Sequence, residues 1–122
     1  MTVSGLNHFS IRTTDLARSR DFYQRALDLR DGERPPFPFP GHWMYCGEVP
    51  VIHLIGVEAE VGRDTGAVDH LAFTAHDLDG TRERLRGHGY DFGERTVPGM
   101  NLHQVFVRDP DGVLIELNFP GD

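Results

Sequence analysis

The chain carries two stretches of sequence with the same pattern. "GLNHFSIRTTDL", residues 5–16, and "AVDHLAFTAHDL", residues 67–78, align with residue 5 on residue 67, and they then share a histidine, an aspartate, a leucine and their apolar positions. This alignment places His8 on His70. A repeat inside 122 residues makes each half one unit of supersecondary structure that cannot bury a core alone. The two halves are therefore expected to pack together as a pseudo-symmetric pair.

Each half is predicted to run strand, helix and then two or three strands. Asp15 and its repeat partner Asp77 stand where helix N-caps are expected. The elements expected in the first half are a strand over 6–12, a helix over 16–27, and strands over 43–46 and 49–56. Those expected in the second half are a strand over 68–74, a helix after Asp77, a weak strand at 95–97, and strands over 103–108 and 113–119. The Asp-Pro-Asp-Gly stretch at 109–112 predicts a turn between the last two.

Charge and composition exclude several classes of partner. The 12 basic and 19 acidic residues give a net charge of -7, so no basic surface for nucleic acid or an anionic membrane is expected. No apolar stretch approaches the roughly 20 residues of a membrane span, and no signal-peptide pattern is present. The single cysteine, Cys46, is interpreted as a small buried hydrophobe. A cytoplasmic protein is expected.

Polar groups gather on one face of the predicted strands. His8 and His70 leave their strands on the face opposite the apolar residues that should meet the helices. Matching "VIHLIG" to "LIELNF" puts His53 beside Glu116 on that same face, with a slip of one residue. Burying a lone carboxylate costs several kcal/mol unless a charge or a metal compensates. Glu116 therefore marks a candidate functional site.

Two imidazoles and a carboxylate form a facial ligand set for Fe(II), Mn(II), Ni(II) or Zn(II). His8, His70 and Glu116 are the predicted metal ligands, which leaves two or three positions open for water and substrate. The alternative is that the histidines are structural and that the glutamate pairs with an arginine. His53 remains open between a fourth ligand, an acid or base group, and a substrate contact.

Further residues are candidates for catalysis. His103 precedes the strand "QVFVR" and is predicted to face the same cavity as a proton shuttle. Tyr90 follows the glycines that end the second helix, and it either packs in the core or reaches the substrate. With His53, these residues form the predicted acid and base groups.

Aromatic residues are the candidates for substrate binding. The proline-rich segment 34–41 contains Phe37 and Phe39, which either tuck inward or form an aromatic wall with Trp43 over a pocket. Asn118 lies two residues beyond Glu116 on the same strand face, where its amide could hydrogen-bond a ligand.

The chain resembles the vicinal oxygen chelate superfamily, which includes glyoxalase I, extradiol dioxygenases, methylmalonyl-CoA epimerase, and the fosfomycin and bleomycin resistance proteins. The resemblance lies in "LNHFSIRTTDLARSRDFYQRALDL", "VDHLAF" and "VFVRDPDGVLIEL". It implies an α+β fold in which two βαβββ modules form a cupped mixed sheet with a metal in the cup. The implied boundaries are one domain over residues 1–122, with modules at 5–58 and 66–120.

The resemblance also implies a chemistry. The family's two histidines and its last-strand glutamate fall on His8, His70 and Glu116, with a divalent metal ion (Fe, Mn, Ni or Zn) as cofactor. The implied substrate is a small molecule that chelates the metal through neighbouring oxygens. Family members with one pair of modules per chain often complete the site across a dimer, so a homodimer is expected. The bleomycin-binding branch lacks such a ligand set, which favours an enzyme.

Position 53 separates the reactions of the family. Glyoxalase I commonly has a glutamate there and the epimerase a glutamine, whereas this chain has His53. Extradiol dioxygenases use two histidines and one glutamate on iron and need a nearby histidine and tyrosine, for which His53, His103 and Tyr90 are candidates. Dioxygenase-type chemistry is therefore weighed slightly ahead of glyoxalase-type lyase or isomerase chemistry. The alternatives are a drug-binding protein without catalysis and a thiol transferase of the fosfomycin type.

Overall fold

The order strand, helix and three strands occurs twice in the computed structural model, which describes residues 2–121. The elements are β1 (Phe9–Thr13), α1 (Leu16–Arg25), β2 (Arg30–Gly32), β3 (Gly41–Cys46), β4 (Val49–Gly56), β5 (Leu71–Thr74), α2 (Leu78–Gly87), β6 (Phe92–Val97), β7 (Leu102–Arg108) and β8 (Leu114–Pro120). Within this described part, no helix is long and apolar enough to cross a membrane.

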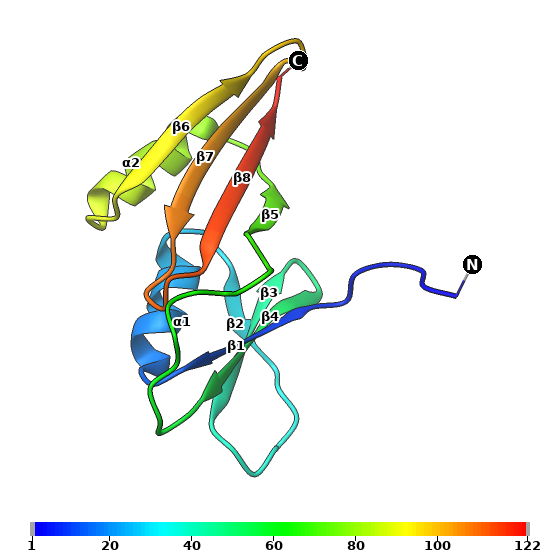
Figure 1. Cartoon of the computed structure of the whole chain (residues 1–122), viewed down its shortest axis with the longest axis vertical. Coiled ribbons are helices and arrows are strands. Elements are labelled where there is room, and N and C mark those ends of the chain that lie inside the picture. The colour runs from blue at the N-terminus through cyan, green and yellow to red at the C-terminus, as the bar shows by residue number, and fades with distance from the viewer. Residues whose placement is uncertain (1, 122) are drawn as a thin grey trace.

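The two halves form two four-stranded sheets with equivalent strand orders. The first sheet runs β1-β4-β3-β2 and the second β5-β8-β7-β6 (Figure 1). In each sheet the first and last strands of the half pair in parallel, and the other neighbours are antiparallel. Both sheets are thus mixed, and the α+β fold predicted from the sequence is confirmed. β1 and β5 each end a sheet and keep one free edge within it.

The apolar face of each sheet lies against the core, as the alternation predicted. Ile11, Ile52 and Leu54 are buried in the first half, and Leu71 and Ile115 in the second. They belong to one cluster that also contains residues of both helices. Because alternate residues of a strand point to opposite faces, the opposite face of each sheet is left for polar side chains.

Both helices begin at the aspartates that the repeat singled out. The side chain of Asp15 accepts a hydrogen bond from the backbone N of Arg18, and that of Asp77 accepts one from the backbone N of Gly80. These bonds satisfy backbone donors that a helix leaves unpaired in its first turn. The first helix ends at Arg25, two residues earlier than predicted.

The structure corrects the sequence expectation in several places. Residues 6–8, predicted as strand, precede β1 in an extended arm that projects from the body (Figure 1). Pairing with β4 begins only at Phe9, opposite Ile52. The short strand β2 was not expected, and β6 is longer than the predicted 95–97. Cys46, expected to be buried, is exposed because it ends β3 at the hairpin turn to β4.

The turn between β7 and β8 joins the two halves. Asp109 and Asp111 of this turn are buried against α1. The hydroxyl of Tyr23 donates to Asp109 Oδ2 at 2.7 Å, and that of Ser19 donates to Asp111 Oδ2 at 2.7 Å. Burial raises the pKa of Asp109, while the Tyr23 hydrogen bond opposes that shift. The turn predicted from "DPDG" is therefore also the polar contact that fixes one half on the other.

Candidate metal centre

His70 and Glu116 face each other on the second sheet. His70 immediately precedes β5, and Glu116 lies in the middle of β8, the parallel neighbour of β5. The Nε2 atom of His70 is 3.5 Å from Oε1 of Glu116. The glutamate side chain is only 11% exposed, so this carboxylate is held in a largely water-free position.

Each of these two side chains has a hydrogen-bond partner on the side that faces away from the other. Nδ1 of His70 lies 2.7 Å from Oδ2 of Asp69, and the amide Nδ2 of Asn118 donates to Oε2 of Glu116 at 2.8 Å. A proton on Nδ1, shared with Asp69, leaves the lone pair of Nε2 directed toward the carboxylate. The hydrogen bond with Asp69, aided by the charge of Glu116, raises the pKa of His70.

This arrangement fits a metal cation. A nitrogen lone pair and a carboxylate oxygen that face each other need a proton or a metal ion between them. Two donor atoms that each lie about 2.1 Å from one cation are about 3.0–3.4 Å apart at octahedral or tetrahedral angles. The observed 3.5 Å between His70 Nε2 and Glu116 Oε1 is close to that spacing. A carboxylate behind a ligating histidine is the usual outer partner of a metal site.

His8 and His53 form a second pair on the first sheet. Their rings stack with centroids 3.7 Å apart, and the ring of Trp43 stacks on the other side of His53 at 4.0 Å. Nδ1 of His8 lies 2.7 Å from Oδ1 of Asn7, so the residue before the histidine contacts its Nδ1, as Asp69 does in the second half. The repeat therefore extends to the partners of the two histidines.

The Nε2 atom of His53 is buried and has no hydrogen-bond partner. Burial, followed by the neighbouring charge of His8, lowers the pKa of His53. A neutral imidazole with an unused nitrogen is able to bind a metal or accept a proton. The alternatives for His53 therefore stand as they were, and burial favours the uncharged form of its ring.

The structure brings the predicted ligands together in two pairs. His70 lies with Glu116, and His8 lies with His53. Among residues 2–121, no group of three or more His, Cys, Asp or Glu side chains is arranged to hold a single ion. Each of these two pairs is referred to as a half-site.

Two predicted catalytic residues lie away from both half-sites. His103 shares a face of β7 with Val105, a core residue, whereas the neighbouring Phe106 is the cross-strand partner of Glu116. Its Nε2 is 2.6 Å from Glu94 Oε1. The prediction that His103 faces the cavity with Glu116 is wrong, because strand alternation turns it to the helix side.

Tyr90 also lies on the helix side. Its ring packs edge-on against Phe22 of α1, with centroids 5.2 Å apart. Burial raises the pKa of Tyr90, and its nearest charges are Arg25 and Asp21 of the same helix. Of the two alternatives for this residue, the structure favours packing in the core.

The predicted aromatic residues do form one continuous surface. Phe37 stacks on Phe39 at 5.2 Å and lies 6.2 Å from Trp43, which in turn stacks on His53. The guanidinium of Arg34 covers both phenylalanine rings. Phe37 and Phe39 remain 42% and 41% exposed, so the wall is open to a ligand.

Four residues at the site were not identified from the sequence. Asn7 and Asp69 hold the two histidines, and their equivalent places in the repeat were the signal that could have found them. Gln104 donates to Asn118 at 2.9 Å, and Arg95 donates to Gln104 at 2.9 and 3.1 Å. No local pattern marks these last two, because their role depends on strand register.

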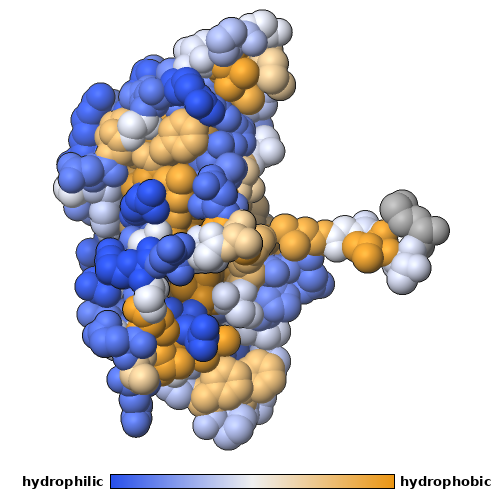
Figure 2. All heavy atoms as spheres, in the orientation of Figure 1, coloured by the Kyte–Doolittle hydropathy of each residue, from blue (hydrophilic) through white to orange (hydrophobic). Residues whose placement is uncertain are grey.

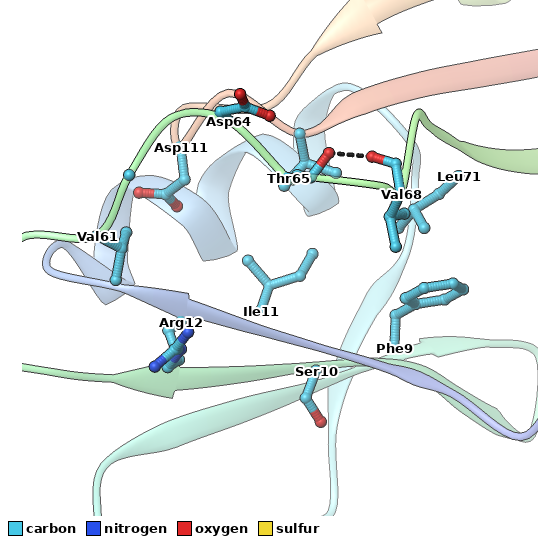
Figure 3. A pocket seen from close by; sticks show the side chains of 12 residues that line it. Phe9, Ser10, Ile11, Arg12, Val61, Asp64, Thr65, Val68, Leu71 and Asp111 are labelled. Carbon is cyan, nitrogen blue, oxygen red and sulfur yellow. Dashed lines mark hydrogen bonds between the residues drawn. The ribbon is translucent and has the colours of Figure 1, made fainter.

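A cavity of about 320 Å³ lies between β1 and the segment that joins the two halves (Figure 3). Ile11, Val61, Val68 and Leu71 line it, and the hydroxyl of Thr65 donates to the carbonyl of Val68 beside it. Neither half-site contributes a histidine or glutamate to its lining. The cavity belongs to the junction of the halves.

Comparison with known proteins finds one family. The family model of the Glyoxalase/Bleomycin resistance protein/Dioxygenase superfamily matches residues 5–117. The lactoylglutathione lyase of Escherichia coli O157:H7 is 33% identical over 124 residues, which cover 92% of this chain and 90% of that enzyme.

Solved structures share the fold. A glyoxalase/dioxygenase from Nostoc punctiforme matches with a TM-score of 0.82 at 17% identity, over 99% of this chain and 94% of its own. A glutamate-to-glutamine mutant of the fosfomycin resistance protein FosX from Listeria monocytogenes, in complex with Mn(II) and 1S,2S-dihydroxypropylphosphonic acid, matches with a TM-score of 0.77 at 19% identity, over 99% and 95% of the two chains.

Proposed function

The chain belongs to the Glyoxalase/Bleomycin resistance protein/Dioxygenase superfamily, and from this premise we propose that it is a divalent-metal-dependent enzyme. Its substrate is a small molecule that binds the metal through two neighbouring oxygens. The reaction is of the lyase or isomerase type. The 33% sequence identity between this chain and a lactoylglutathione lyase supports lyase or isomerase chemistry.

One observation carries the proposal. His70 Nε2 and Glu116 Oε1 face each other at 3.5 Å, each held from behind by a hydrogen bond that leaves the facing atom free. This is half of a ligand set for Mn(II), Fe(II), Ni(II) or Zn(II). A proton on Nε2 or a metal ion can lie between the two atoms, and the family of the chain favours the metal ion.

The other half of the ligand set comes from a second copy of the chain. His8 and His53 lie with each other and not with Glu116, so a complete set requires that the first sheet of one subunit meet the second sheet of another. β1 and β5 each have one edge without a neighbouring strand in their sheets. Contact between two subunits at these edges would cover backbone groups that are otherwise unpaired. We therefore place the site between two subunits.

The exposed apolar surface supports a dimer. Leu6 is 80% exposed and Val3 is 71% exposed, and both lie in the arm that stands away from the body in Figure 2. Apolar side chains this exposed would be covered if the arm packed against a second subunit. The arm leads directly into His8, so the segment that would contact a partner also positions a predicted ligand.

The residues of the proposed site have different roles in the reaction. When bound, the metal acts as a Lewis acid that stabilises negative charge on the substrate oxygens. His70 and Glu116 would hold it from one subunit and His8 from the other. To His53 we assign the acceptance and return of a substrate proton, because its Nε2 has no hydrogen-bond partner and burial lowers its pKa. The wall of Phe37 and Trp43 excludes water from one side.

The placement of His103 and Tyr90 favours lyase or isomerase chemistry over ring cleavage, the reverse of the slight preference from the sequence. The candidates for the histidine and tyrosine of ring cleavage were His53, His103 and Tyr90, and of these His103 and Tyr90 lie on the helix side of the sheets, which leaves no tyrosine among the candidates at the site. Moving a proton between neighbouring carbons needs a single base, and His53 supplies one.

Metal content tests the proposal. We expect purified protein to hold about one divalent ion per subunit, as a symmetric dimer with two sites would. H70A loses the ion, while H76A, which removes an exposed histidine, retains it. The hemithioacetal of methylglyoxal and glutathione is the first substrate to try, with catechols under oxygen as the comparison. Equal metal content in H70A and the parent would refute the site.

The exposed aromatic wall favours a second candidate function. A drug-binding protein without catalysis would hold an aromatic ligand against Phe37, Phe39 and Trp43. Its binding would survive a chelator and would depend on Trp43 but not on His70. Titration of an aromatic ligand into parent, W43A and H70A proteins, with and without chelator, separates the two functions.

A further inference from the structure

A row of hydrogen bonds crosses the second sheet and ends at Glu116. Arg95 of β6 donates from Nε and Nη2 to Oε1 of Gln104 on β7, at 3.1 and 2.9 Å. Gln104 Nε2 donates to Oδ1 of Asn118 on β8 at 2.9 Å, and Asn118 Nδ2 donates to Oε2 of Glu116 at 2.8 Å. The members of each cross-strand pair lie directly opposite each other in the register.

The cation at the far end fixes the direction of the whole row. A guanidinium can only donate hydrogen bonds, so Gln104 must present its oxygen to Arg95 and its NH₂ group to β8. Asn118 must then present its own oxygen to Gln104 and its NH₂ group to Glu116. Turning either amide around would set two donors or two acceptors against each other. Gln104 is only 6% exposed, so water cannot easily repair such a mismatch.

We propose that Arg95, Gln104 and Asn118 are positioning residues that select Oε1 of Glu116 as the single metal-binding oxygen. The inference rests on the proposed function, in which Glu116 is a ligand. The amide of Asn118 occupies Oε2, which leaves Oε1 toward Nε2 of His70. Arg95 acts at a distance: two strand spacings, about 10 Å, separate β6 from β8.

Reversal of the row is the decisive test. In R95E the new carboxylate accepts from Gln104, so both amides turn and Asn118 presents its oxygen to Glu116. In Q104E the new side chain cannot donate to Asn118, which has the same effect. Both substitutions add negative charge, and simple Coulomb attraction would therefore strengthen cation binding. The row predicts the opposite, a loss of Mn(II) affinity of about tenfold, the scale typical of lost outer-shell contacts.

Matched variants isolate the effect. Q24E makes the same chemical change at an exposed position of α1 and should leave Mn(II) affinity unchanged. R95K keeps a donor-only cation and should lose less affinity than R95E. Affinity is measured on the full-length protein by titration with Mn(II) followed by electron paramagnetic resonance, with circular dichroism to verify the fold of each variant.

The outcomes separate the two proposals. If the parent protein binds Mn(II), H70A does not, and R95E and Q104E bind it as tightly as the parent or tighter, the row does not position Glu116 and only this inference fails. If the parent and H70A bind Mn(II) alike, the proposed metal site itself fails. Weaker binding in R95E and Q104E, with Q24E unchanged, supports both.

Discussion

At the scale of single residues, the two faces of one sheet give glutamate two different roles. Glu116 accepts a neutral amide donor and faces an imidazole nitrogen. Glu94, on the helix face, accepts from Arg82 and lies 2.6 Å from His103. Hydrogen bonds from Arg82 and then from His103 lower the pKa of Glu94 to about 2. Arg82 and His103 thus compensate the charge of Glu94 within the fold, whereas Glu116 faces the imidazole of His70, which is itself a candidate metal ligand.

Replacement of Glu94 should therefore change stability in a pH-dependent way. Its pKa is about 2 in the fold, against about 4.3 in an unfolded chain, so its contribution is full above about pH 5 and is lost as the pH falls toward 2. E94Q is expected to lower the free energy of unfolding by about 1 kcal/mol at pH 7, since the group is partly exposed.

Urea unfolding of parent and E94Q proteins at pH 7 and pH 3 measures this. E83Q, an exposed position on α2, serves as the control and should match the parent at both values. A deficit in E94Q that stays the same at pH 3 would show that packing, and not charge, explains it.

Residue types and strand faces were predictable from the sequence, but their partners were not. The repeat and the period of two placed His53 and Glu116 on the polar face, opposite core neighbours such as Ile52 and Ile115. His8 and His70, predicted within strands, precede β1 and β5 but contact His53 and Glu116. His103 was misplaced because the prediction took its neighbours Val105 and Val107 as cavity residues, when they belong to the core. Strand alternation assigns a side chain to the correct face of the sheet only when the face of one of its neighbours is already known.

At the scale of elements, the β7–β8 turn and α1 decide how the halves meet. Tyr23 is fully buried, and its hydroxyl is a donor to a buried carboxylate. Ser19 and Thr13 donate to Asp111 in the same way. These bonds link residues that are 86 to 98 positions apart in the sequence, so the turn connects the two modules as well as forming a hairpin.

Loss of the Tyr23 hydroxyl should weaken that connection. Y23F leaves Oδ2 of Asp109 without this donor in a buried place, which costs about 1–3 kcal/mol of unfolding free energy. Y45F is the matched control, because the Tyr45 hydroxyl donates to an exposed backbone carbonyl where water replaces it. Urea unfolding of both variants at pH 7 provides the comparison. Equal effects of the two substitutions would contradict a special role for the turn.

The order of elements could be predicted, and their junction could not. Asp15 and Asp77 correctly predicted the starts of the two helices, and the proline and glycine of residues 109–112 predicted the turn. A repeat, however, states only that two modules are alike. Which faces of them meet within one chain depends on long-range contacts such as Tyr23 with Asp109, and no local pattern encodes these.

At the scale of the whole molecule, the chain presents two half-sites that it does not join. The free edges of β1 and β5, the apolar arm before His8, and the separation of the two ligand pairs are consistent with one arrangement. In a twofold dimer, each site takes His8 and His53 from one subunit and His70 and Glu116 from the other. Two equivalent sites result, each at the meeting of two sheets.

Metal binding by mixed dimers tests this arrangement most directly. H8A and E116A subunits are co-expressed with different tags, and the dimer that carries both tags is purified. Dimers of H8A alone and dimers of E116A alone should not bind Mn(II). The mixed dimer should bind one ion, because one of its two sites receives an intact His8 and an intact Glu116. Unaltered chains paired with a double variant, H8A and E116A in the same chain, should bind none. The opposite pattern, with no ion in the first mixed dimer and one ion in the second, would place each site within a single chain and contradict the shared site.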